Sequence, residues 1–172
     1  GVKEIGKRAF FVCPNLTEIN IPDVPVKIRE DAFKNCGYYK DANNWQDSML
    51  YIGKHLIESN SDAQEVTVKD GTITVADYAF YDAPDTVKVL NLPDSLIRIG
   101  DYSFFGTFVL DKINFGECLK YIGAHAFEGT QELDELILNN NLISIGDYAF
   151  AGSAFYKVYF PTSLREFNPT AF

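Results

Sequence analysis

Few side chains in this sequence have the type and spacing needed for acid–base or nucleophilic chemistry. The only histidines are His55 and His125, and each stands where sister segments have tyrosine, so we interpret both as surface substitutions. Carboxylates are numerous, but Asp77, Asp101 and Asp147 recur singly at regular intervals, whereas general acid–base catalysis needs groups converging on one substrate. The sequence has no His-Glu-x-x-His, Gly-x-Ser-x-Gly or phosphate-binding glycine-rich loop. We therefore predict no enzyme, no metal site and no cofactor.

The sequence has three cysteines, Cys13, Cys36 and Cys118. Because their number is odd and no two have the Cys-x-x-Cys spacing, they predict neither a disulfide framework nor a zinc site. Two of them follow a phenylalanine by three residues, at a position that is small in every sister segment. Cys118 takes another small position, where Ser95 and Ser163 stand elsewhere. Because a free thiol is a small and readily buried group, we interpret all three as structural.

These recurring positions belong to one repeated phrase, Ile-Gly-Asp-Tyr-Ala-Phe or a close variant. The copies end at Phe10, Phe33, Phe80, Phe104, Phe127, Phe150 and Phe172. Successive intervals are 22 to 24 residues, and the one longer interval, 47 residues, equals two periods. A fixed period of this length is typical of a solenoid, in which each coil buries its apolar residues against its neighbours. We expect residues 1–172 to form a single domain of about eight coils.

Each segment also contains the apolar pattern Leu-x-x-Ile-x-Ile, as in Leu110, Ile113 and Phe115. Alternation over the last three positions predicts a short strand with one buried face. Pro, Gly or Asn follows and ends the strand. The predicted fold class is an α/β solenoid: a right-handed superhelix with a parallel sheet of short strands, short helical or 3-10 turns, and about 23 residues per repeat.

A second apolar pair, such as Leu119 with Ile122, leads into the repeated phrase. There we expect the aspartate to cap a single helical turn and the glycine to relieve strain where the turn begins. The alanine and phenylalanine should point inward, so that stacked coils build a continuous column of phenyl rings.

Residues 37–62 depart from this pattern. Residues 38–47 are polar and aromatic without a clear period, which predicts a surface loop. Residues 49–58 fit either a degenerate coil or two strands that turn at Gly53 and Lys54, and the hairpin is the favoured alternative.

Composition limits the partners. The formal net charge is -9 and the pI is near 4.6, and the 15 Lys and Arg residues form no cluster, so a nucleic-acid partner is not expected. No apolar run is long enough to predict membrane insertion of this segment.

The repeated phrase, the small or Cys position, the Leu-x-x-Ile-x-Ile-Pro strand and the period near 23 together resemble the BspA-like branch of leucine-rich repeat proteins. The resemblance spans essentially the whole chain, and the irregular unit with Trp45 and Leu50-Tyr51-Ile52-Gly53 is similar to an insertion that recurs in such proteins. It implies a bacterial protein that is exported or surface-attached and that acts as an adhesin or interaction module. It offers no catalytic residues to transfer.

In such a fold the residues between the buried strand positions face outward on one surface, where a ligand could bind. Along this surface a row of amides and hydroxyls gives way to an apolar end, which we interpret as an anchor for a protein partner. The alternatives are that the solenoid continues or is capped at this end, or that the asparagines merely bond to one another along the stack. The candidate residues are Asn91, Lys112, Asn114, Glu135, Ile137, Tyr156, Lys157 and Tyr159.

Trp45 and the neighbouring tyrosines Tyr38 and Tyr39 are a second candidate, because exposed loop aromatics can stack on sugars or enter a partner's pocket. The alternative is that they fold back over the irregular coil.

We therefore expect a non-catalytic module for protein–protein interaction or adhesion, outside the cell or at its surface. A structural spacer in a larger exported protein is the main alternative, and a glycan-binding module is a third. The chain begins and ends within the repeating phrase, so we expect it to be cut from a longer array and to self-associate weakly through uncapped ends.

Overall fold

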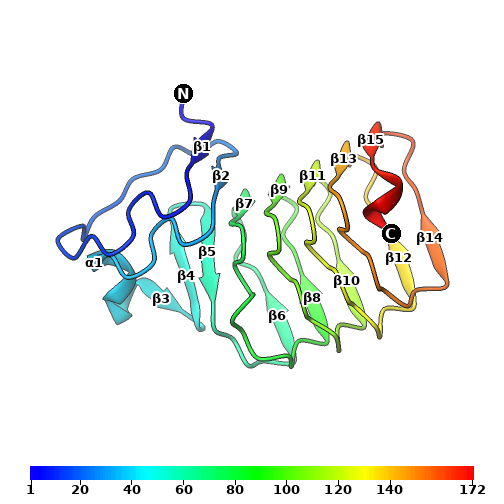
Figure 1. Cartoon of the computed structure of the whole chain (residues 1–172), viewed down its shortest axis with the longest axis horizontal. Coiled ribbons are helices and arrows are strands. Elements are labelled where there is room, and N and C mark those ends of the chain that lie inside the picture. Colours follow the sequence, from blue (N-terminus) through cyan, green and yellow to red (C-terminus); the bar gives the residue numbers. More distant parts are fainter.

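The computed structural model describes residues 1–172, and the chain winds into a row of stacked coils (Figure 1). There are about 7 turns of about 23 residues, where the sequence predicted about eight. The predicted solenoid of short parallel strands is confirmed. No helix is long and apolar enough to cross a membrane.

The Leu-x-x-Ile-x-Ile segments form strands from residue 65 onward, as predicted. Each has an inward central residue, such as Leu90 or Leu136, between two more exposed ones. The strands are parallel but form two separate groups, because β10 and β12 do not pair. These strands are β6 (Glu65–Thr67), β8 (Val89–Asn91), β10 (Lys112–Asn114), β12 (Glu135–Ile137) and β14 (Lys157–Tyr159). We call their outward side the ladder face.

The first such segment, residues 16–21, is not a strand, so the prediction of one strand in every repeat is wrong there. In the neighbouring coil, the segment beside residues 16–21 is a short helix, α1 (Gly37–Lys40), and not a strand. The Tyr38 N–H donates to the Leu16 carbonyl at 2.6 Å. With a helix beside it, the segment has no extended partner to pair with.

A second sheet, which the sequence analysis missed, is built from the second apolar pair of each coil. Its parallel strands place residues such as Ile99, Ile122 and Ile145 in register, all buried. The eight-stranded order is β15-β13-β11-β9-β7-β5-β4-β3, and β1 and β2 form a separate pair. The bounds are β1 Glu4–Ile5, β2 Lys27–Ile28, β7 Thr74–Val75, β9 Arg98–Ile99, β11 Tyr121–Ile122, β13 Ser144–Ile145 and β15 Glu166–Phe167.

The repeated phrase forms tight turns, so the predicted helical turn is wrong. Alternate backbone donors of the turn bond to the next coil: the Tyr78 N–H donates to the Asp101 carbonyl at 2.9 Å, and the Phe80 N–H donates to the Ser103 carbonyl at 2.8 Å. A helix would need those donors for its own carbonyls. The only 3-10 helices are Ala42–Asn44 and Pro169–Ala171.

The glycine and aspartate of the phrase act between coils. An added Cβ on Gly123 would lie 2.5 Å from the backbone carbon of Gly100, so the glycine permits close stacking and does not relieve a strained entry. The positive φ falls two residues later, at 56° for His125. The Asp101 carboxylate accepts the Ala124 N–H at 3.0 Å and so caps the neighbouring coil.

The predicted column of phenylalanines is present, with one interruption. Rings of Phe104, Phe127 and Phe150 are stacked with centroids 5.0 and 5.3 Å apart and are almost completely buried. Phe33 belongs to a separate apolar cluster of 10 buried residues, apart from the main cluster of 27. Phe10 stacks on Phe33 at 5.3 Å but is 41% exposed in the first coil, so the prediction that it points into the core is wrong.

The interruption is the irregular unit, where the favoured hairpin is confirmed. Strands β4 (Met49–Ile52) and β5 (His55–Ser59) are antiparallel and turn at Gly53 and Lys54. β3 (Trp45–Gln46) pairs with β4 through a two-residue turn. The hairpin occupies one coil but contains no phenylalanine turn, and the N-terminal coils lie beyond it at one end of the row (Figure 1).

Candidate functional site

The amide row on the ladder face is hydrogen-bonded along the stack. The Asn114 amide donates to the Asn91 side-chain oxygen at 2.5 Å, and the Asn91 amide donates to Thr67 and Glu65 at 3.2 and 2.9 Å. This is the alternative in which the asparagines bond to one another. Lys112 lies exposed beside this row, on β10.

The apolar end of the ladder face brings five of the predicted residues together. In the β12–β14 pairing Glu135 lies opposite Lys157 and Ile137 lies opposite Tyr159. Ile137 is 61% exposed, Tyr159 is 44% exposed and Tyr156, next to β14, is 74% exposed. Each side chain therefore offers apolar surface to solvent, as an anchor for a partner requires.

Charged groups surround this apolar end. The Lys157 ammonium lies 4.7 Å from the centre of the Tyr159 ring and 3.8 Å from a Glu135 oxygen. Hydrogen bonding to Tyr159 raises the pKa of Lys157, and the Glu135 charge raises the pKa of Tyr156. At neutral pH Lys157 is therefore a cation and the Tyr156 phenol is neutral.

The sequence analysis missed one residue at this site. Phe160 is 52% exposed, although the strand pattern predicts it to be buried. It lies in the outermost coil and contacts Phe167 and Phe172 instead of another coil. With Ile137 and Tyr159 it lines a hollow at the end of the ladder face.

Trp45 folds back over the irregular coil. Its indole N–H donates to the Tyr39 carbonyl at 2.8 Å, and its ring meets the Tyr39 ring edge-on at 5.3 Å. The Tyr38 hydroxyl donates to the Tyr51 carbonyl. Instead of an open loop, this segment is a short helix packed on the hairpin, and its aromatic groups are half-buried.

The two histidines have different environments. His125 takes the tyrosine position as predicted and stacks between Tyr102 and Tyr148, with centroids 4.3 and 5.0 Å away. His55 is completely buried on β5, so its interpretation as a surface substitution is wrong. Its Nε2 lies 3.1 Å from the Pro22 carbonyl, and burial lowers its pKa. The hairpin brings this position against another coil.

The cysteines are all free thiols, and Cys36 is buried at the small position as predicted. Cys118 is exposed and Cys13 is partly exposed, so burial of a small thiol accounts for Cys36 but not for Cys118. The serines at the same position in other repeats bond to a neighbouring coil. The Ser95 hydroxyl, for example, donates to the Thr72 carbonyl at 2.8 Å. No such bond is present for the Cys118 thiol.

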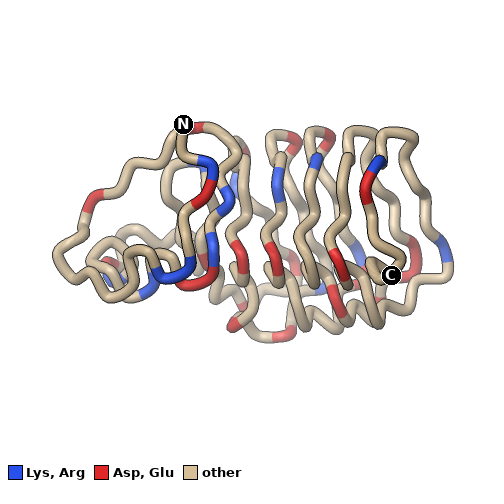
Figure 2. Tube along the Cα trace, turned by 45° about the horizontal axis from the view of Figure 1, so that its top comes forward, with Lys and Arg blue, Asp and Glu red and all other residues tan.

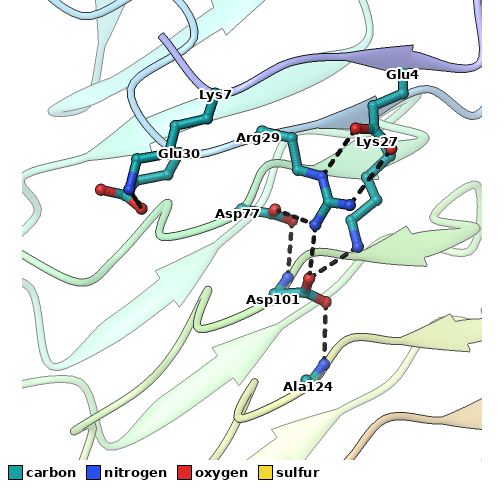
Figure 3. Close-up of polar contacts among 8 residues, drawn as sticks. All are labelled: Glu4, Lys7, Lys27, Arg29, Glu30, Asp77, Asp101 and Ala124. Carbon is teal, nitrogen blue, oxygen red and sulfur yellow. Dashed lines mark hydrogen bonds and ion pairs between the residues drawn. The ribbon is translucent and has the colours of Figure 1, made fainter.

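A polar cluster that sequence reasoning missed joins the N-terminal coils to the main row (Figure 3). We call Glu4, Lys27, Arg29, Asp77 and Asp101 the junction cluster. The guanidinium of Arg29 lies between Glu4 at 3.1 Å and the carboxylates of Asp77 and Asp101 at 3.6 and 3.2 Å. Lys27 binds Asp101 at 2.8 Å. These groups meet because Asp77 follows β7 and donates its N–H to the Ile28 carbonyl past the hairpin.

The buried carboxylate of this cluster has an altered acidity. The Asp77 side chain is only 4% exposed, and burial, with the nearby Asp101 charge, raises its pKa to about 6. The Asp101 N–H, Lys27 and Arg29 act in the opposite direction but do not offset the burial. On the other side of the junction, burial also raises the pKa of Glu58, which accepts the Tyr39 hydroxyl at 2.7 Å.

Comparison with known families agrees with this geometry. The BspA type leucine rich repeat region matches the sequence in 6 copies, over residues 1–107 and 51–172. The chain belongs to the BspA-type leucine-rich repeat family. A search of the curated proteins finds no match.

Solved structures with the same fold come from several bacteria. A leucine rich cell surface protein from Faecalibacterium prausnitzii is similar over 99% of this chain and 54% of its own, with 20% identity and a TM-score of 0.71. A leucine-rich repeat protein from Bacteroides capillosus is similar over 65% of this chain and 97% of its own, with 21% identity and a TM-score of 0.54. The pneumococcal vaccine antigen PcpA is similar over 95% of this chain and 47% of its own, with 21% identity and a TM-score of 0.53. The chain thus spans about half the length of the first of these proteins.

Proposed function

We propose that this chain is a non-catalytic recognition module that binds a protein partner through the apolar end of the ladder face. The carrying observation is that Ile137 and Tyr159 lie opposite each other on two paired strands, that Tyr156 is next to β14, and that all three side chains are exposed to solvent. Tyrosine is enriched among residues that dominate protein interfaces, since it offers a large apolar surface and one polar group at low entropic cost.

The surrounding residues fit such a surface. Glu135 and Lys157 form the charged edge, and the hollow beside Phe160 can accept an apolar side chain of the partner. The hydrogen-bonded Asn91 and Asn114, with Lys112 beside them, form a polar row on the same face to which contacts with the partner extend.

The family supports a location outside the cell, because one similar structure is described as that of a cell surface protein. We propose the same location and an adhesive or partner-binding role for this chain. The fold supports this role, because rows of outward side chains on a rigid solenoid form extended binding surfaces.

A pull-down from host extracellular proteins, followed by affinity measurement with the purified partner, tests the proposal. We expect the Tyr156→Ala and Tyr159→Ala double variant to bind at least tenfold more weakly, because interface tyrosines commonly account for about 2 kcal/mol each. Tyr121→Ala, at an exposed tyrosine on β11 of the other sheet, serves as the matched control.

Equal affinities for the double variant and the wild type would refute the ladder face as the binding surface. Absence of any captured partner would favour the structural spacer. Binding on a glycan array that depends on Trp45 would favour the glycan-binding module, although Trp45 is half-buried and bonded to Tyr39.

A further inference from the structure

The turns of the four regular coils form a second exposed surface, away from the strands of the ladder face. Counted from the aspartate position of the repeated phrase, the second position is aromatic in all four turns and the fifth is aromatic in the first two. These side chains stack from coil to coil. We call the following residues the turn ridge: Tyr78, Tyr81, Tyr102, Phe105, His125 and Tyr148.

The ridge is continuous. Tyr78 stacks on Tyr102 with centroids 4.8 Å apart, and His125 and Tyr148 continue the same column. Tyr81 stacks on Phe105 at 5.6 Å and forms a shorter second row. These side chains lie outside the buried phenylalanine column, and Tyr81 and Tyr148 are 48% and 44% exposed.

Every formally charged residue in these four turns is acidic. Residues 77–86, 101–109, 124–132 and 147–155 contain seven carboxylates and no Lys or Arg. Figure 2 shows acidic positions in a row across successive coils. The seven are Asp77, Asp82, Asp85, Asp101, Glu128, Glu132 and Asp147. The two N-terminal turns differ, because they contain Lys7, Arg8, Arg29 and Lys34.

Several of these carboxylates are open to solvent. Asp77 and Asp101 are held in the junction cluster and do not contribute. Asp147 is exposed and its carboxylate makes no hydrogen bond or ion pair, and the Asp82 side chain is 64% exposed beside its ion pair with Lys34. Acceptors for a cationic ligand are therefore available beside the rings.

We propose that the turn ridge is a second interaction surface, which binds an arginine- or lysine-rich extended segment of a partner protein. Each ring of the column stacks on its neighbours, so a guanidinium or ammonium group meets an open ring face where the stack ends, as at Tyr148. Along the column the tyrosine hydroxyls can accept hydrogen bonds from such a group, and the neighbouring carboxylates add charge complementarity. Four rings at a coil spacing of about 4.8 Å cover about 15 Å, which matches about five residues of extended chain.

Fluorescence anisotropy with a labelled hexa-arginine peptide, at physiological salt, tests this proposal. Peptides of the same length with glutamine or glutamate in place of arginine are the ligand controls. We expect the arginine peptide alone to bind, and the Tyr81→Ala and Tyr148→Ala double variant to lower its affinity by about five- to tenfold.

The matched control is the Tyr156→Ala and Tyr159→Ala variant, which removes two exposed tyrosines from the ladder face and should leave peptide affinity unchanged. Likewise, Asp82→Asn with Asp147→Asn should weaken binding, whereas Asp62→Asn with Asp70→Asn, exposed acids outside these turns, should not. NMR chemical-shift mapping on the wild-type protein should place the peptide's contacts in the four turns. This measurement does not depend on whether any variant folds.

If both tyrosine double variants, or both aspartate double variants, changed the peptide affinity equally, the binding would be non-specific charge attraction and the proposal would be overturned. Shifts outside the turns, or no binding at millimolar peptide, would have the same consequence. Light scattering that shows a dimer lost in the Tyr81→Ala and Tyr148→Ala variant would make the occupant a second copy of this chain and also overturn it.

Discussion

Asp77 should contribute less to the stability of the folded protein at neutral than at acidic pH, because its carboxyl is buried. The folded pKa of Asp77 is about 6, above its ordinary value of 3.8. A raised carboxyl pKa means that the folded state binds the proton more tightly than the unfolded state. Its stabilising contribution is therefore complete below pH 3.8 and is lost as the pH rises through about 6.

The magnitude follows from the difference of about two pKa units, each of which corresponds to about 1.4 kcal/mol. The Asp77→Asn variant keeps an oxygen that can accept the Asp101 N–H, now at 2.9 Å from Asp77, but has no charge. We expect the variant to be more stable than the wild type by about 3 kcal/mol at pH 7.5 and by less than about 1 kcal/mol at pH 4. Comparing the two proteins cancels other titrating groups, including His55, whose lowered pKa destabilises the folded state in acid.

Urea unfolding followed by circular dichroism at several pH values measures this difference, and a carbon-13 NMR titration of the Asp77 carboxyl measures its pKa directly. Asp147→Asn is the matched control, because Asp147 occupies the same position of the phrase but is exposed. A wild type more stable than Asp77→Asn at neutral pH would mean that the Arg29 contact outweighs burial, and would refute the reasoning.

Three further predictions concern packing. Gly123→Ala should destabilise the protein by about 1–3 kcal/mol in urea unfolding, because its Cβ would overlap the Gly100 backbone, whereas Gly6→Ala meets no atom within 4 Å and should be neutral. An equal loss in both would contradict the close-stacking role of the glycine. Phe127→Ala should lower the free energy of unfolding by about 3–5 kcal/mol through a cavity in the buried column, and normal melting would contradict this. In the native protein a maleimide should label Cys118 rapidly and Cys36 only after unfolding, and rapid labelling of both, measured by mass spectrometry, would contradict the burial of Cys36.

The sequence predicts the features that repeat. The interval between phenylalanines predicts the solenoid and the buried ring column, and the break before Phe80 predicts the hairpin. The apolar end of the ladder face is also readable, because Ile137 and Tyr159 are the outward positions of adjacent strands.

The features that the sequence does not reveal depend on contacts between coils. Asp101 is a reasonable helix cap within its own segment, but its actual partner is the backbone of Ala124 in the next coil. The Arg29 and Asp77 contact joins residues 48 positions apart, and only the hairpin's shape brings them together. Burial of His55 has the same origin, because an unrepeated segment gives no period from which to infer its neighbours.

Hydroxyl-radical footprinting of the chain, alone and with a captured partner, tests most directly whether the apolar end of the ladder face is the recognition surface. We expect oxidation of Tyr156, Tyr159 and Ile137 to fall in the complex while oxidation of Tyr121 stays unchanged. Unchanged oxidation of all three residues, with protection on the opposite sheet, would contradict the proposed function.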